Sequence, residues 1–522
     1  MKNMKYILGL MIAMPFCAWA ADANASDVGA TTVPFGRIYD AVTSFTDLYE
    51  TNFVKLLDNK PTYTLGDVAQ ACVNFTKYSN GKVNNKTCQD FMRSVIDKSN
   101  FIASTTVEDF VVTTTDNTTV FEFDIYASGD FYIDCDVDDT GSQIIKLEPN
   151  SHTVKCDYSG KSGQYKIKIT GEATGYPDCT ERNTKCSAIS FWHNTNLHSI
   201  QGSLGSVFKT LSNGVQPKFI GTFDGCENLT GPIPQNLFAG ISGQPVAHMF
   251  DATFLGCKKL DGEIPKGLFG KLSGAPAEDM FRATFQNCSG LEGEIPSGLF
   301  GELSGAPAEG MFRATFYGCE KLDGKIPSGL FGKLSGAPAE DMFNATFQNC
   351  SGLDGEIPKG LFGKLSDAPA VRMFDGTFYG CENLDGEIPS GLFGKLSGVP
   401  AKEMFRSTFN GCKNLDGKIP SGLFGKLSGA PAVRMFAYTF NGCENLDGEI
   451  PSGLFGELSG APAKEMFNYT FKDCTNLSGP LAKSGEQFLH EIWPDASMAH
   501  IDGMYIGCTN LEGWSDIPGA WR

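Results

Sequence analysis

The chain has 522 residues, 41% of them hydrophobic, which is enough for about two to four domains with buried cores. Its formal net charge is -18, so it is poorly suited to bind nucleic acid or an anionic membrane, both of which require positive charge. Glycine is abundant, at 61 residues, and recurs at regular intervals, which indicates repeats rather than disorder.

Residues 1–20 have the features of a secretory signal peptide. Lys2 and Lys5 precede a short apolar segment, and Ala18 and Ala20 supply small residues for cleavage after Ala20. The apolar segment is too short to span a bilayer, and no later stretch reaches 18 apolar residues. We therefore expect an exported chain, secreted or at the cell surface, with no transmembrane span in the mature protein.

Residues 21–106 predict a helical N-terminal region. Within residues 37–57, apolar side chains recur at close to the helical period. Cys72 and Cys88 bracket a polar loop, and because an exported protein can keep disulfides, this pair is a disulfide candidate.

Residues 107–200 predict a small antiparallel β-sandwich domain. The segments TVFEFDIYA and GQYKIKITG alternate apolar and polar residues, and Gly, Ser and Asp turns lie between such segments. Two further disulfide candidates lie here: Cys135 with Cys156, in two of the strands, and Cys179 with Cys186, around a short loop.

The segment DCDVDDTG within this domain has two possible interpretations. Asp134, Asp136 and Asp138 alternate as in a calcium-binding loop, but Asp139 stands at the sixth position, where an EF-hand loop needs glycine. The alternative is an acidic turn between strands.

A repeat with a fixed 31-residue period begins near residue 219. Nine cysteines follow one another at this constant spacing, and Cys508 comes after a slightly longer interval. The nine are Cys226, Cys257, Cys288, Cys319, Cys350, Cys381, Cys412, Cys443 and Cys474. A fixed period in this range predicts a solenoid. We assign it residues 201–479, with a degenerate repeat and a C-terminal cap over residues 480–522.

Each repeat predicts one helix and one strand. Around Cys288, Ser273 can cap a helix whose apolar face includes Met280 and Phe281, and the segment LEGEIP then alternates inward and outward residues until Pro296 ends the strand. The segment SGLFGEL follows as a turn or a single helical turn. The sequence therefore predicts an α/β solenoid; the alternative is that the Met-Phe segment is itself a strand of the leucine-rich-repeat type.

The segments MFRSTFNGCKNLDGKIP and NLDGEIPSGLF resemble the leucine-rich repeats of BspA-like bacterial surface proteins. The segment SHTVKCDYSGKSGQYKIKITGEATGY resembles the PKD-like β-domain that precedes such repeats in exported bacterial proteins. Together these resemblances cover residues 107–513. They imply leucine-rich-repeat architecture and a binding or adhesion role at a bacterial surface.

The cysteine column has three possible interpretations. Metal ligation needs cysteines clustered at close spacing, whereas here each repeat supplies only one. A disulfide ladder needs Cα separations of about 4.4–6.8 Å, which stacked strands allow and packed helices forbid. The third interpretation, which we favour, is that the column consists of buried free thiols.

The outward face of the L-x-G-x-I-P strand carries two columns of charge, which are the candidate ligand-binding residues. The first column is Asp261, Glu292, Asp323, Asp354, Asp385, Asp416 and Asp447. The second is Glu263, Glu294, Lys325, Glu356, Glu387, Lys418 and Glu449. Such a face fits a basic or cation-rich partner laid along it, or it serves solubility and prevents sheet association. The column six residues before each cysteine shows no single chemical purpose.

We find no catalytic motif. His490 in HEIWP lacks the second histidine of a zinc protease, and no P-loop or dinucleotide fingerprint occurs. The sequence therefore predicts a non-enzymatic binding or adhesion protein without cofactor, which contacts protein or glycan on a host or microbial surface through many equivalent repeats. The alternatives are a structural spacer that presents the N-terminal domains and a secreted hydrolase with its site in the N-terminal part.

Overall fold

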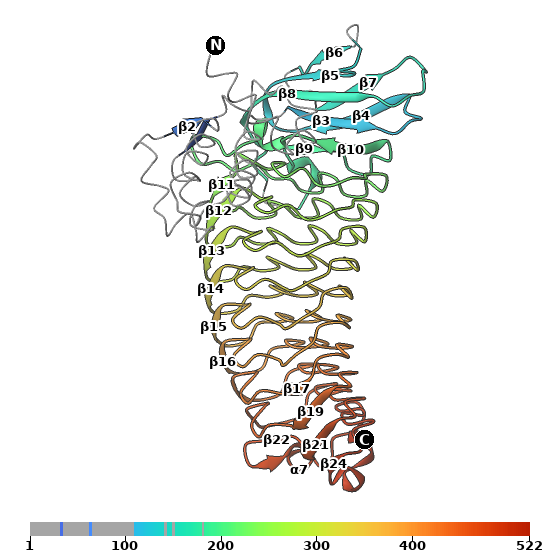
Figure 1. The fold of residues 1–522 in the computed structure, drawn as a ribbon. Helices are drawn as coiled ribbons and strands as arrows, with labels where there is room; N and C mark the ends of the chain where they lie inside the picture. The colour runs from blue at the N-terminus through green and yellow to red at the C-terminus, as the bar shows by residue number, and fades with distance from the viewer. Residues whose placement is uncertain (1–31, 35–61, 65–108, 140–142, 149–151, 180–181) are drawn as a thin grey trace, which may run out of the picture. The chain divides into compact units, whose positions relative to one another are not determined.

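The computed structural model describes residues 109–139, 143–148, 152–179 and 182–522, together with two short strands nearer the N-terminus (Figure 1). The chain divides into two compact units, Met1–Glu108 and Asp109–Arg522. In the first unit, β1 (Thr32–Pro34) and β2 (Thr62–Thr64) pair antiparallel. The rest of the predicted helical region, with Cys72 and Cys88, lies outside the described residues. Because the two described segments are strands, the helical prediction gains no support.

The β-domain, residues 109–201, contains two antiparallel sheets. A five-stranded sheet has the order β10-β3-β8-β5-β6, and a three-stranded sheet has the order β7-β4-β9. The strands are β3 (Phe110–Thr114), β4 (Val120–Ile125), β5 (Ser128–Asp134), β6 (Ile144–Lys146), β7 (Thr153–Asp157), β8 (Lys166–Gly175), β9 (Ile189–Ser190) and β10 (Leu197–Gln201). The 3-10 helices η3 (Thr184–Cys186) and η4 (Leu204–Ser206) lie beside the last strands.

The two sheets of the β-domain share a core and a covalent link. Phe110 of one sheet and Phe121 and Phe123 of the other all contact the ring of Phe191, at centroid distances of 5.0–6.3 Å. A disulfide joins Cys135, directly after β5, to Cys156 in β7, with Cα atoms 5.6 Å apart. The bond therefore connects one sheet to the other.

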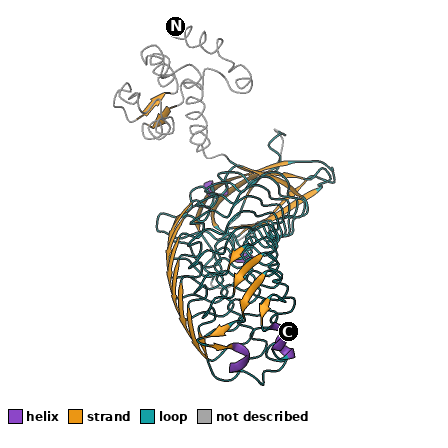
Figure 2. Ribbon diagram, turned by 60° about the horizontal axis from the view of Figure 1, so that its bottom comes forward, coloured by secondary structure: helices purple, strands orange, loops and turns teal. Residues whose placement is uncertain are grey.

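Beyond the β-domain, the chain winds into stacked coils, one for each repeat (Figure 1). We divide each coil into three sides. One side is a short strand, which reads K-L-S-G in four coils and differs slightly in the others, and successive copies form an eight-stranded parallel sheet. Its strands are β11 (Ser242–Gly243), β12 (Lys271–Gly274), β13 (Glu302–Gly305), β14 (Lys333–Gly336), β15 (Lys364–Asp367), β16 (Lys395–Gly398), β18 (Lys426–Gly429) and β20 (Glu457–Leu458). These strands form the continuous orange edge in Figure 2.

The second side is the L-x-G-x-I segment. Successive copies are joined by single parallel bridges, such as that between Gly262 and Leu291. Towards the C-terminus the bridges lengthen into a four-stranded parallel sheet of β17 (Gly417–Lys418), β19 (Leu446–Glu449), β21 (Leu477–Pro480) and β24 (Leu511–Glu512). Leu291 and Ile295 are buried and Glu292 is exposed, so the predicted inward and outward alternation is correct.

The third side, the Met-Phe segment, is a series of overlapping turns, and the predicted helix is wrong. Alternate backbone N–H groups point to the next coil: Phe281 donates to the carbonyl of Met311 at 3.0 Å. The N–H groups between them close local turns, as Arg282 does on the carbonyl of Asp279 at 3.2 Å. Positive φ recurs every fourth residue, at 47° for Asp279 and 52° for Ala283. An α-helix has neither feature.

The architecture is therefore a β-solenoid, and the α/β expectation is wrong. Ser273, predicted to cap a helix, lies in strand β12, and the end of the SGLFGEL segment begins strand β13. Among the residues that the structure describes, the sole α-helix is α7 (Leu489–Ile492), which lies beyond the repeats. In the turn segments, alternate N–H groups donate to the neighbouring coil. A helix could not form these hydrogen bonds between coils, because its N–H groups point along its own axis.

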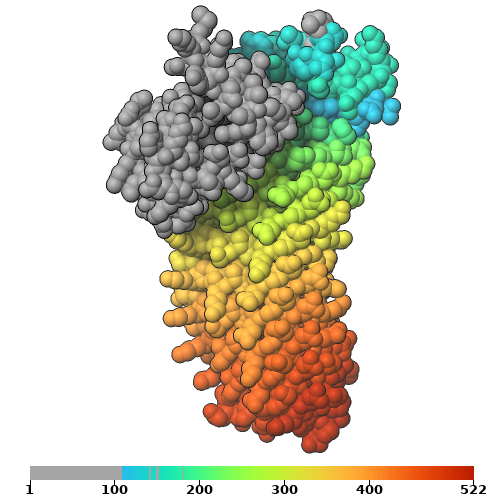
Figure 3. Space-filling view, viewed as in Figure 1, coloured from blue at the N-terminus to red at the C-terminus, as the bar shows by residue number. Residues whose placement is uncertain are grey.

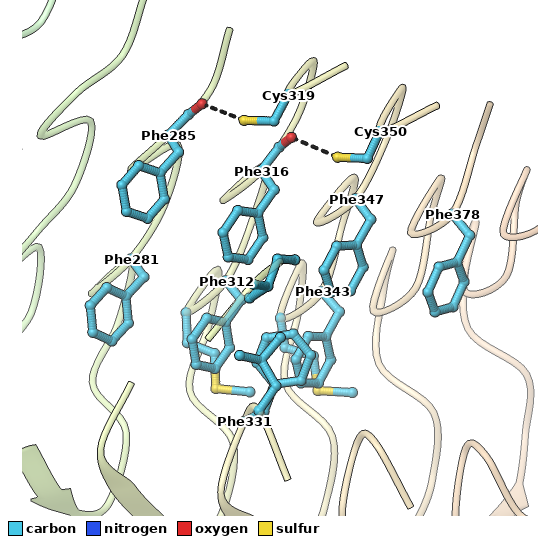
Figure 4. Close-up of a cluster of buried hydrophobic side chains, with 14 of the residues drawn as sticks. Phe281, Phe285, Phe312, Phe316, Cys319, Phe331, Phe343, Phe347, Cys350 and Phe378 are labelled. Carbon is cyan, nitrogen blue, oxygen red and sulfur yellow. Dashed lines mark hydrogen bonds between the residues drawn. The ribbon is translucent and has the colours of Figure 1, made fainter. Parts of the chain in front are cut away.

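The interior of the solenoid consists of aligned side chains of one kind. Phe281, Phe312 and Phe343 stack with nearly parallel rings at centroid distances of 5.6 and 5.7 Å, and Phe331 meets Phe312 at 4.6 Å (Figure 4). Equivalent phenylalanines in the other coils are also buried. Each ring obtains its contacts from the coils above and below, so an isolated coil would leave these apolar groups in water.

Buried polar side chains hold the same coils together. The hydroxyl of Thr284 donates to the carbonyl of Phe250 in the preceding coil at 2.9 Å. The thiol of Cys319 donates to the carbonyl of Phe285 at 3.0 Å (Figure 4). Threonine and cysteine recur at these buried positions along the stack, where each has a hydrogen-bond partner for its polar atom.

The C-terminal end of the stack is covered by residues that leave the repeat pattern. Trp493 packs near Phe467, its indole N–H donates to the carbonyl of Gly460 at 2.9 Å, and Trp521 is fully buried. Tyr505 continues the phenylalanine stack at 6.0 Å from Phe471. The covering elements are β22 (Lys483–Ser484), β23 (Gln487–Phe488), α7, η5 (Trp514–Asp516) and η6 (Gly519–Trp521).

Candidate binding surface

The two predicted charge columns lie side by side on the L-x-G-x-I side of the solenoid. All fourteen side chains are exposed: twelve carboxylates and the ammonium groups of Lys325 and Lys418. We call them the acidic face. The parallel bridges between Gly262 and Leu291 and their equivalents align the columns from coil to coil. Figure 3 shows the surface of the solenoid, with residue number increasing from the β-domain to the C-terminus along the stack.

The glycine between the two acidic positions orients the second column. Gly293 has a φ of 78°, and a Cβ atom there would lie 2.7 Å from Cγ of Glu263 in the preceding coil. Gly386 and Glu356 show the same relation, at 2.5 Å. Each side chain of the second column therefore lies over the glycine of the next coil. A residue with a Cβ atom at that glycine position would collide with it.

A column with more lysines than carboxylates lies on another side of the solenoid. The first position of the K-L-S-G strand is exposed in every coil from β12 to β20. It holds Lys271, Glu302, Lys333, Lys364, Lys395, Lys426 and Glu457. We did not predict this column, although a comparison of equivalent positions at the 31-residue period would have found it. The solenoid thus has an acidic side and a side richer in lysine.

The turn side carries a network of ion pairs that we did not predict. Two columns form it, six and nine residues before each cysteine, and in both an acidic residue of one coil faces an arginine of a neighbouring coil. In the first column, Arg406 contacts Asp375 at 3.0 Å. In the second, Arg372 contacts Asp341 at 2.8 Å, and Arg434 pairs with both Glu403 and Glu465. The column for which the sequence showed no single purpose therefore supplies ion pairs between coils, both within itself and with the other column, as Arg313 does with Asp341 at 3.3 Å.

Two buried carboxylates in this network differ in pKa because they differ in the number of groups that donate hydrogen bonds to them. Asp341 accepts two hydrogen bonds from Arg372, at 2.8 and 2.9 Å, and one from Asn344 at 2.8 Å. Burial would raise its pKa, but these donors and the charges of Arg313 and Arg372 lower the pKa overall. Asp375 has Arg406 as its partner, and burial raises the pKa of Asp375 to about 6.

The repeat cysteines are buried free thiols. All ten, from Cys226 to Cys508, are unbonded and buried in the described structure. Burial raises the pKa of Cys226, Cys319 and Cys381 to about 12, which leaves the thiol protonated at neutral pH. The thiol of Cys319 also donates a hydrogen bond to a carbonyl of the preceding coil. The cysteine column is therefore not part of the exposed binding surface.

The acidic turn of the β-domain binds its own backbone. Oδ1 of Asp134 accepts from the N–H of Asp136 at 3.2 Å, and Oδ1 of Asp136 accepts from the N–H of Asp138 at 3.3 Å. Asp138 also pairs with Lys166 at 2.9 Å. These contacts fit a turn between strands. Nearby, a disulfide joins Cys179 to Cys186 and closes the loop that carries Arg182.

Comparison with known protein families, with curated proteins and with solved structures finds no match for this chain. The resemblance to BspA-like repeats therefore rests on the repeat motifs alone. Over the described part of the chain, no helix is long and apolar enough to cross a bilayer.

Proposed function

We propose that this chain is an exported binding protein, secreted or held at a bacterial surface, that contacts protein or glycan partners through the acidic face of its solenoid. The observation that carries the proposal is the exposure of twelve carboxylates in two aligned columns over seven successive coils. The resemblance of its repeats to BspA-like surface proteins supports the same role.

The repetition suggests how such a face would bind. Each coil offers nearly the same pair of outward side chains, so a single coil makes only a weak contact. A partner that spans several coils gains affinity because each further contact forms at high effective concentration. The chemistry of the face favours partners with regularly placed positive charge, and the net charge of -18 disfavours nucleic acid.

The alternative role is that of a spacer. It is favoured by the uninterrupted stack of identical buried side chains, from the first coil to the C-terminal cap, since such a stack is suited to a stiff support. In that case the acidic face maintains solubility and prevents sheet association.

Binding of three forms of the full-length chain to an array of glycans and surface proteins separates the two roles. The test variant replaces the twelve acidic residues with Asn or Gln, and the matched control replaces the five exposed lysines of the K-L-S-G strands with Gln. We expect the native chain and the control to bind the same array members and the acid-neutralised variant to lose them. Equal binding by all three forms would favour the spacer.

A further inference from the structure

Three side chains of the metal-binding type meet where the turn side of the solenoid begins. His248 and Asp251 belong to one coil and Asp279 to the next, and one potential ligand atom of each lies within 4.8 Å of the other two. His248 is 5% exposed and Asp251 is fully buried. Across the part of the chain that the structure describes, no second group of His, Cys, Asp and Glu has this arrangement.

Coil stacking brings these residues together. His248 and Asp279 occupy the same turn position in successive coils, with positive φ values of 59° and 47°. The N–H of His248 donates to the carbonyl of Glu278 at 2.8 Å, which fixes one coil on the next. Asp251 lies one turn further along, and its N–H donates to the carbonyl of His248 at 3.3 Å. The backbone therefore holds the three side chains in place before any ligand binds.

Two buried atoms of the group lack hydrogen-bond partners: Nδ1 of His248 and Oδ1 of Asp251. Nδ1 lies 3.4 Å from Oδ2 of Asp251 and 3.7 Å from Oδ2 of Asp279, longer than good hydrogen bonds. Ligand atoms at about 2.0–2.2 Å from a tetrahedral zinc ion lie roughly 3.3–3.6 Å apart. The separations from Nδ1 to one oxygen of each carboxylate are thus close to those of ligands around an ion.

The same position elsewhere in the solenoid shows that His248 is unusual. Four coils later this column holds Arg372, which closes on Asp341 with hydrogen bonds of 2.8 and 2.9 Å. The spacing of the coils therefore allows a basic and an acidic side chain of this column to form hydrogen bonds with each other. His248 faces two carboxylates and forms a hydrogen bond of this length with neither.

Two arginines adjoin the group and are compatible with an ion. Arg182 donates to Oδ2 of Asp251 at 2.7 Å, which orients the carboxylate and leaves Oδ1 available. Arg282 lies 3.5 Å from Oδ1 without a hydrogen bond, and its side chain is 25% exposed, so it can turn towards water. Asp224 and Glu278 add negative charge close to Asp251 and Asp279, which offsets part of the arginine charge.

We propose that Nδ1 of His248, the carboxylate of Asp251 and Oδ2 of Asp279 bind a divalent transition-metal ion. One imidazole and two carboxylates suit zinc, and three protein ligands leave a fourth coordination position for water. The ion would join two successive coils. Because Arg182 lies on the loop closed by the Cys179–Cys186 disulfide, the site would also connect the start of the solenoid to the end of the β-domain.

Zinc titration of the chelator-treated full-length protein tests the site directly. We expect one zinc ion per chain by calorimetry and a rise of roughly 3 °C in the unfolding temperature at saturating zinc. Cobalt substitution should give the visible absorption of a nitrogen- and oxygen-bound ion. A thiolate charge-transfer band would assign the ion to the repeat cysteines and overturn the proposal, as would the absence of zinc binding.

Variants locate the ion and separate metal binding from a simple ion pair. His248→Arg keeps a cation in the column but removes the ligand atom, and Asp279→Asn removes a ligand from the other coil. Both should lose zinc binding. Asp341→Asn, at the same column position three coils after His248, should retain it. Zinc binding that persists in both site variants, or a stability of the native protein that does not change with zinc, overturns the proposal.

Discussion

The β-domain and the solenoid keep their parts together by different means. In the β-domain, antiparallel strands distant in sequence pair with one another, and disulfides cross-link Cys135 with Cys156 and Cys179 with Cys186. In the solenoid, each coil contacts the coils directly before and after it, and ten cysteines remain unbonded thiols, such as Cys319, that donate hydrogen bonds to the preceding coil. Cysteine thus acts as a covalent link in one region and as a small buried donor in the other.

The difference indicates where stability resides in each region. A disulfide restricts the unfolded state of a domain whose contacts are long-range. A stack of coils gains its stability from nearest-neighbour interfaces, so a defect in one coil weakens mainly the two interfaces that it shares. Substitutions in the two regions should therefore differ both in magnitude and in how far their effects spread.

The largest effect is expected for Phe312→Ala in the middle of the solenoid. Phe312 is fully buried and stacks on rings in both neighbouring coils, so the variant should lose about 4 kcal/mol of unfolding free energy. Denaturant unfolding measures the loss, and hydrogen exchange should show faster opening in the adjacent coils. The control Lys333→Ala, at an exposed position, should change stability by less than about 0.5 kcal/mol. Equal effects of the two substitutions would contradict the stacked core.

Removal of the Cys135–Cys156 disulfide should have the next largest effect. The double variant Cys135→Ser, Cys156→Ser opens a loop with a sequence separation of 21 residues and should cost the β-domain about 3 kcal/mol. Cys319→Ser in the solenoid should cost about 1 kcal/mol, because the hydroxyl can still donate to the carbonyl of Phe285. Chemical denaturation of each variant, followed with probes in each region, makes the comparison. A greater loss for Cys319→Ser would reverse the roles assigned to the two kinds of cysteine.

The third prediction concerns pH and the ion pairs of the turn side. The folded-state pKa of Asp375 is about 6, above its ordinary value, so the folded chain holds a proton that the unfolded chain releases between about pH 4 and 6. The stabilising contribution of this carboxyl is greatest below about pH 4 and is lost as pH rises to about 6. Relative to the native protein, Asp375→Asn should therefore gain about 2 kcal/mol in unfolding free energy between pH 4 and pH 7.

Asp341→Asn is the matched control with the opposite sign. The folded-state pKa of Asp341 is lowered, so its carboxylate stabilises the fold above the ordinary aspartate pKa and loses that contribution as pH falls. The variant should be destabilised most at neutral pH and less in acid. Urea unfolding at pH 4 and pH 7 checks both variants, and parallel pH profiles for the two would show that partner number does not set their ionisation.

The smallest effect on stability is expected at the acidic face. Asp354→Asn removes one exposed charge from a column of like charges and should change unfolding free energy by less than about 0.5 kcal/mol, in the stabilising direction. Thermal unfolding measures it. A loss of about 2 kcal/mol of unfolding free energy would indicate that the acidic column stabilises the stacking of the coils. The acidic column would then not differ from the buried columns in this respect.

Much of the solenoid could be predicted from the sequence, and the failures have physical causes. The inward and outward alternation of the segment with Leu291 and Ile295 was predicted correctly because a period of two is unambiguous. The neighbouring segment was assigned to a helix because Met280, Phe281 and Phe285 fall near a helical period, but the true period is four, that of the turns. Periods of four and 3.6 differ too little to be distinguished over a segment this short.

The site residues divide in the same way. The acidic face was found because its members recur at two fixed positions of the repeat and twelve of the fourteen carry the same sign of charge. The ion-pair network was missed because its columns mix both signs, and the mixture is informative only when each residue is compared with its equivalent in the next coil, as Asp375 is with Arg406. The group of His248, Asp251 and Asp279 requires, in addition, knowledge of which two columns lie beside each other. The sequence pattern alone does not supply that knowledge, because it depends on the path of the turns.

The central claim is that the acidic face binds through many weak and equivalent contacts, and graded neutralisation tests it most directly. Full-length variants with the acidic residues of one, three or seven coils neutralised would be compared for affinity towards a single array partner of the native chain. The account predicts a progressive fall in affinity with the number of coils neutralised, whichever coils are chosen. Unchanged affinity with all seven coils neutralised, or complete loss on neutralising one particular coil, would contradict it.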